Sequence, residues 1–208
     1  MTVWGYALLG LSVSSISVAM FAPPFTVAEE STPRLVTTEW LEDNLSRKDI
    51  RIVDLRGSVK DYWQRHIPGA VYLSPEAMRW PEGGDPVKLI HPEALVKLLG
   101  EIGIDKNMMV VAYSERGDYK APYLIWALDY IGHRRSAILD GGFGRWKEEG
   151  RPVTQDYPRI KPRQYRLPSK LNEEVRATLE EVKRSIGRKD VVLDWEQFVP
   201  VFEGDPQV

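Results

Sequence analysis

Three residues of the types found in hydrolytic triads occur in the chain, as Asp54, His66 and Ser114. A serine hydroxyl becomes a nucleophile when a histidine takes its proton and a carboxylate orients that histidine. However, no Gly-x-Ser-x-Gly pattern surrounds Ser114, and His66 opens a His-Ile-Pro-Gly turn in which an imidazole commonly bonds nearby backbone. We therefore favour a structural role for His66 over a triad.

A polar loop at residues 114–120 could instead bind an anion. It consists of Ser114, Glu115, Arg116, Gly117, Asp118, Tyr119 and Lys120. The loop has the length of a phosphatase Cys-x5-Arg loop, but serine replaces the thiolate and lysine replaces the arginine. Phosphoryl transfer is thereby excluded, which leaves an anion-binding, pseudo-phosphatase-like module as one alternative. Two acids and two bases give this loop little net attraction for an anion, so a solvated surface loop is the simpler interpretation.

The composition excludes several other chemistries. The 208 residues contain no cysteine, so they hold no disulfide, no thiolate metal site and no cysteine nucleophile. His66, His91 and His133 lie far apart without a metal-ligand spacing, and we expect neither a metal nor a cofactor. With 28 basic and 30 acidic residues the net charge is -2, which argues against nucleic acid as a partner.

Alternating helical and strand patterns predict the elements that position these residues. Expected helices begin at Thr38, with Thr37 or Thr38 as N-cap, and at Pro92, and others cover 121–131 and 143–149; expected strands cover 50–55, 108–113 and 136–139. This alternation predicts an α/β fold with a central parallel sheet and helices on both faces. Asp54 and Arg56 would flank the end of the first strand, where they could line the rim of a ligand pocket or form an ion pair.

The N-terminus has the composition of an export signal. Residues 1–28 contain no charged side chain, the run 3–21 is dominated by apolar residues, and small residues precede Glu29. This pattern predicts a signal peptide at 1–28, or an uncleaved membrane anchor in the same segment. Either way, we expect the remainder to be exported, periplasmic or secreted.

The C-terminal part repeats the beginning of the domain. Residues 156–170 are rich in proline and basic side chains and are expected to form a solvated, extended linker. A second helix is then expected from Asn172, with Val175, Leu179, Val182 and Ile186 on one face, followed by a strand at 191–194. Arg-Lys-Asp triplets at 47–49 and 188–190 precede the matching strands. We therefore expect 171–208 to be the truncated start of a second domain.

Four motifs in order give the chain a resemblance to a known family. They are Val53-Asp54-Leu55-Arg56, the segment 66–71 (His-Ile-Pro-Gly-Ala-Val), the strand 110–113 (Val-Val-Ala-Tyr), and Gly132-His133 followed by 139–143 (Leu-Asp-Gly-Gly-Phe). The chain resembles the rhodanese family of thiosulfate and 3-mercaptopyruvate sulfurtransferases. The resemblance implies a rhodanese-like three-layer domain at 34–155 and the opening of a second such domain at 171–208.

The resemblance also assigns a position to the missing cysteine. In the family, the residue after the strand that resembles 108–113 is the cysteine that forms a persulfide when sulfur is taken from thiosulfate; Ser114 stands there in this chain. A serine hydroxyl forms no stable persulfide, so the domain resembles the non-catalytic first domain of tandem rhodaneses. The implied partner is a catalytic rhodanese domain, or another protein, bound through 171–208.

Overall fold

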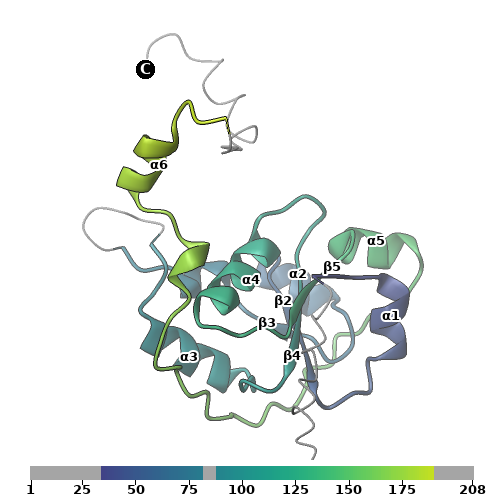
Figure 1. Ribbon diagram of the computed structural model, residues 1–208. Helices are drawn as coiled ribbons and strands as arrows, with labels where there is room; N and C mark the ends of the chain where they lie inside the picture. Colours follow the sequence, from purple (N-terminus) through teal and green to yellow (C-terminus); the bar gives the residue numbers. More distant parts are fainter. Residues whose placement is uncertain (1–33, 82–87, 190–208) are drawn as a thin grey trace, which may run out of the picture. The chain divides into compact units, whose positions relative to one another are not determined.

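The computed structural model describes residues 34–81 and 88–189 (Figure 1). The predicted signal or anchor at 1–28 and the predicted strand at 191–194 lie outside the described residues. Within the described ranges, we find no helix with the length and apolar character needed to cross a bilayer.

The described residues form a five-stranded parallel sheet. Its strands are β1 (Leu35–Val36), β2 (Ile50–Asp54), β3 (Val71–Tyr72), β4 (Met109–Tyr113) and β5 (Ser136–Leu139), in the order β1-β5-β4-β2-β3. The parallel register places the ends of β2 and β4 side by side, with Asp54 opposite Tyr113. The predicted parallel sheet is confirmed. The edge strands β1 and β3 were not predicted, because two residues are too short for a recognisable pattern.

Helices connect the strands. They are α1 (Thr38–Asp43), α2 (Val59–Gln64), the 3-10 helix η1 (Pro75–Met78), α3 (Pro92–Glu101), α4 (Lys120–Tyr130) and α5 (Gly142–Glu148). Thr37 is the N-cap of α1, because its side chain accepts a hydrogen bond from the backbone N–H of Trp40 at 3.1 Å. Pro92 occupies the first turn of α3, where its missing N–H leaves no intrahelical bond unmade.

Two separate apolar clusters cover the two faces of the sheet. One gathers side chains from α3 and α4, including Leu95, Leu99 and Leu124. The other gathers side chains from α1 and α5, including Leu41 and Trp146, which are fully buried. Each such side chain stabilises the fold by roughly 1.5–3 kcal/mol on burial. The sheet is therefore the middle of three layers, as predicted, and its polar side chains emerge at the strand ends.

Residues 156–170, which we call the strap, have no helix or strand but are not a solvated linker. The side chain of Tyr165 is 8% exposed, and its hydroxyl lies 2.8 Å from Nδ1 of His133. The backbone N–H of Arg163 donates to the carbonyl of Gly100 at 2.9 Å. Ile160 and Leu167 pack on the cluster beneath α3 and α4. The expectation of a solvated segment was wrong because these apolar side chains fix the strap to the domain.

The expected helix from Asn172 is also wrong. A 3-10 turn, η2 (Glu173–Val175), is followed by extended backbone, and the helix α6 (Leu179–Ser185) begins only after Thr178. Thr178 and Glu181 form a reciprocal capping box, which fixes the helix start at that point. The carbonyl of Val175 accepts a hydrogen bond from the indole of Trp126 at 2.8 Å, so η2 packs against α4.

Candidate functional site

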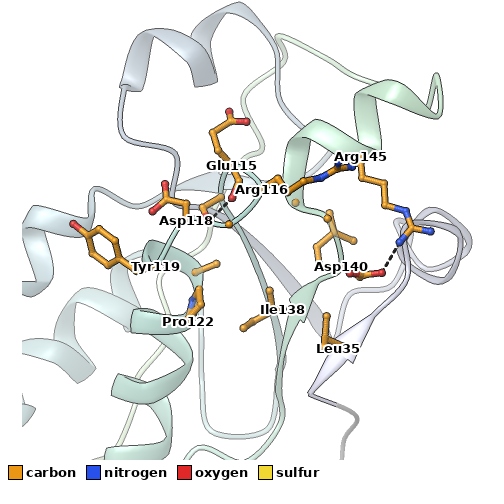
Figure 2. Close-up of a pocket in the computed structure, with 15 residues that line it drawn as sticks. Leu35, Glu115, Arg116, Asp118, Tyr119, Pro122, Ile138, Asp140 and Arg145 are labelled. Carbon is orange, nitrogen blue, oxygen red and sulfur yellow. Dashed lines mark hydrogen bonds and ion pairs between the residues drawn. The ribbon is translucent and has the colours of Figure 1, made fainter. Parts of the chain in front are cut away.

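A pocket of about 700 Å³ lies at the carboxyl ends of β4 and β5. Its walls come from the loop 114–119, the first turn of α4, the end of β5 with the turn into α5, and β1. Figure 2 shows Tyr119 and Pro122 on one side, Asp140 and Leu35 on the other, and Ile138 between them. Ligands bind at this edge of open parallel sheets, so the pocket is the candidate site.

Six of the seven predicted loop residues line the pocket, and Lys120 does not. The opposite wall, formed by Leu35, Asp140 and Arg145, was not predicted from the sequence. The signal for Asp140 was present, since it follows a predicted strand at the same edge as Ser114. Leu35 carried no such signal because it belongs to the unpredicted strand β1.

Ser114 is held in place through its backbone. The residue is 3% exposed, and its carbonyl accepts a hydrogen bond from the N–H of Phe143 at 3.0 Å. A Cβ atom on Gly142 would lie 2.3 Å from that carbonyl oxygen, and Gly142 has a φ of +59°. Glycine is therefore required at the start of α5, because any larger residue would displace the loop.

The structure does not assemble the triad. The Ser114 hydroxyl donates to the Glu115 carbonyl at 3.4 Å. The ring nitrogens of His66 lie 2.8 Å from the Tyr62 carbonyl and 3.2 Å from the Asp156 carbonyl. His66 is therefore a structural residue that fixes the start of the strap to α2.

The loop places a carboxylate of its own at the start of α4. Oδ1 of Asp118 accepts from the backbone N–H of Lys120 at 3.1 Å, and Oδ2 accepts from its Nζ at 2.6 Å. The side chains of Asp118 and Lys120 are only 13% and 23% exposed. A helix N-terminus attracts negative charge, and here Asp118 supplies that charge. An external anion would have to displace Asp118, so the geometry disfavours the anion-binding alternative.

The arginines of the pocket are also paired. Arg116 binds Glu148 at 2.9 Å, and Arg145 binds both Asp140 and Glu149. Hydrogen bonds from Thr38, Arg151 and Arg145 lower the pKa of Glu149 to about 2, from an ordinary value of 4.5. Both arginines that line the pocket are thus neutralised by carboxylates, and neither is left to attract thiosulfate or phosphate.

Asp54 and Arg56 form a buried ion pair. Their side chains are 0% and 3% exposed, and Nη2 of Arg56 lies 2.7 Å from Oδ2 of Asp54. The Tyr113 hydroxyl donates to the same oxygen at 2.7 Å, and the guanidinium carbon lies 3.9 Å from the Phe143 ring centroid. Burial, together with Asp54, raises the pKa of Tyr113 well above its ordinary value.

Neither Asp54 nor Arg56 is among the residues that line the pocket. In the structure the two side chains form the ion pair that was the other interpretation. No group of three His, Asp or Glu side chains able to hold a metal occurs within 34–81 and 88–189.

Residues 37–149, more than half of the chain, match the family model of the rhodanese-like domain. The chain belongs to the rhodanese-like domain family. The match includes β2, β4 and β5 and the loops that follow them, so Ser114 lies within the matched part of the domain.

Relatives of this rhodanese-like chain include several sulfurtransferases. It is 33% identical over 189 residues to a putative thiosulfate sulfurtransferase of Synechococcus elongatus, with 88% of this chain and 58% of that protein covered. It is 32% identical to the sulfur carrier protein TtuD of Thermus thermophilus, and the match covers 73% of this chain and 52% of that protein. It is 30% identical to the thiosulfate sulfurtransferase of Bos taurus, where the match covers 74% of this chain and 56% of that protein. The chain therefore spans little more than half the length of these relatives.

The fold is similar to that of SseA from Escherichia coli, a structure described for 3-mercaptopyruvate sulfotransferases. The TM-score is 0.64 at 23% identity, with 74% of this chain and 62% of that chain covered. At this level of identity the likeness concerns the fold alone. It agrees with the five-stranded parallel sheet and its two helical layers.

Proposed function

We propose that this chain is the non-catalytic rhodanese-like domain of a two-domain sulfurtransferase. The observation that carries the proposal is Ser114 at the end of β4, where the resemblance places the persulfide-forming cysteine. The serine is buried, its loop supplies its own anion in Asp118, and nearby arginines are paired. The domain thus has the rhodanese scaffold without a sulfur carrier.

The working cysteine would then belong to a catalytic rhodanese domain that packs against this chain. The internal repeat and the relatives of almost twice the matched length support this arrangement. The helix α6 also supports this arrangement. Leu179 at its start and Ile186 just after its end are each 67% exposed, and such apolar side chains are expected to be covered by a partner. We also propose that the protein is exported, on the strength of the charge-free N-terminal sequence.

The test is the release of thiocyanate from thiosulfate and cyanide, with the full chain and with Ser114→Ala as a matched control. Both proteins should be at the rate of a blank without enzyme, while a catalytic rhodanese assayed in parallel turns over. Turnover by the full chain that is lost in Ser114→Ala would refute the proposal, since Ser114 would then carry the chemistry.

A further inference from the structure

The chain has a strongly basic face at the edge of the sheet opposite the pocket. Segments 46–51, 103–108 and 133–136 lead into the amino ends of β2, β4 and β5, and the strap crosses these segments. Segments 46–51, 103–108 and 133–136, together with the strap, contain 11 of the chain's 28 basic residues but only 3 of its 30 acidic ones. The remainder of the chain holds 17 basic and 27 acidic residues, so positive charge is concentrated at this edge.

The strap is bound to this edge at several points. Arg163 pairs with Asp105 ahead of β4, and Tyr165 contacts His133 ahead of β5. Ile160 lies over Gly103, where an added Cβ would come within 3.0 Å of its side chain. Figure 1 shows the strap in green, passing below the sheet toward α3. The cations of the strap are thus held in a fixed array.

Apolar and basic side chains alternate along the strap. Ile160, Tyr165 and Leu167 pack inward on the domain, and basic residues between them remain exposed. The exposed cations for which no ion pair occurs within the described ranges are Lys48, Lys106, Arg159, Lys161, Arg166 and Lys170.

The three acidic residues of these segments do not neutralise the edge. Asp156 stands at the very start of the strap, where its carbonyl lies 3.2 Å from His66, and the other two are paired. Asp49 is paired with Arg47 at 2.6 Å, and Asp105 with Arg163. Burial, reinforced by the nearby Arg163 cation, lowers the pKa of Arg51, which agrees with crowding of like charges. Such a surface attracts an anionic partner.

We infer that this basic face binds the anionic headgroups of a lipid bilayer. The basic face consists of Lys48, Lys106, Arg159, Lys161, Arg166 and Lys170, and each cation near such a surface strengthens binding severalfold. The chain enters the domain at the same edge, because Arg34 directly precedes β1 of the parallel sheet. The charge-free sequence 1–28 comes just before this entry point and has the apolar run expected of a bilayer-associated segment.

Nucleic acid is the weaker candidate for this face. A long polyanion extends past the face that attracts it and would meet the excess of 27 acids over 17 bases elsewhere on the chain. A headgroup surface is planar and meets only the face turned toward it. The inference does not depend on the proposed function, because the basic face and the pocket lie at opposite edges of the sheet.

The experiment compares two triple variants of equal net charge in the full chain. In the first, Arg159, Lys161 and Arg166 are replaced by Gln; in the control, the exposed Lys60, Lys97 and Lys147 are replaced by Gln. Co-sedimentation is measured with phosphatidylcholine vesicles that do or do not contain phosphatidylglycerol. For each protein, the partition coefficient with phosphatidylglycerol is divided by the one without it, and this ratio cancels any contribution of residues 1–28 that is common to both vesicle types. Thermal midpoints verify that each variant is folded.

We expect the ratio to fall on the order of 100-fold in the strap variant and to change little in the control variant. For the native chain, we expect the ratio to decrease as the salt concentration is raised. An equal effect in both variants would overturn the inference, because bulk charge would then explain binding. The inference would also fail if the native chain showed no preference for phosphatidylglycerol, or bound a DNA duplex in preference to those vesicles.

Discussion

The buried ion pair of Asp54 and Arg56 allows a quantitative test of the structure. In Arg56→Met the apolar stem is largely kept, but Asp54 loses three hydrogen bonds from the guanidinium. Among the described residues, the Tyr113 hydroxyl and the backbone N–H of residue 56 remain as donors, at 2.7 and 2.9 Å. The carboxylate is 0% exposed, so water cannot replace the lost partner.

Removing one partner of a buried pair costs about 3–5 kcal/mol, because it leaves an uncompensated charge. For a domain of this size, that cost corresponds to a fall of roughly 6–20 °C in the thermal midpoint. The assay is thermal unfolding followed by circular dichroism at neutral pH. A double variant, Asp54→Asn with Arg56→Met, should recover much of the loss, since no charge then remains buried.

The control is Arg47→Met, which breaks the pair with Asp49 in which both side chains are about half exposed. It should leave the midpoint almost unchanged, because water solvates the remaining carboxylate. If Arg56→Met also left the midpoint unchanged, the assignment of a desolvated ion pair to Asp54 and Arg56 would be wrong.

Three further predictions concern the contacts around the sheet ends. Gly142→Ala should destabilise the fold by at least about 1 kcal/mol and disturb the Ser114 loop, which a shift in the Phe143 N–H resonance would report; an unshifted resonance would contradict the close approach. Tyr165→Phe should cost about 1–3 kcal/mol by leaving Nδ1 of the buried His133 ring without its partner, and it should speed tryptic cleavage of the strap. Unchanged cleavage would show that this contact does not hold the strap. The pKa of Glu149 is about 2 in the folded state, against an ordinary value of 4.5. Its ion pairs therefore stabilise the fold above pH 4.5 and lose that effect as the pH falls toward 2. Glu149→Gln should thus be less stable than the native chain at pH 6 but equal to it near pH 2, and a stability difference that does not change with pH would refute this assignment.

The layered fold could be predicted because its central strands are long enough to show a pattern. The strands β4 and β5 are nearly continuous apolar runs, and Pro92 marks the start of α3. The edge strands β1 and β3 have two residues each and leave no periodic signal. They are defined by pairing with neighbours, a non-local property that no short window of sequence contains.

The site was predicted on one side only. The loop after β4 could be found because it follows a clear strand, but its internal neutralisation could not, since the partners Glu148 and Glu149 come from α5. The strap was mistaken for a solvated linker because its many prolines and cations are typical of linkers, so the burial of Tyr165 was not predicted. Its burial depends on His133, 32 residues earlier in the chain.

We propose that this rhodanese-like domain carries no sulfur because Ser114 stands in place of the cysteine. The most direct test of this proposal is the intact mass of the full chain after incubation with thiosulfate and removal of excess reagent. The expected result is an unchanged mass under conditions in which a catalytic rhodanese gains one sulfur atom. A gain of one sulfur atom by this chain would contradict the account.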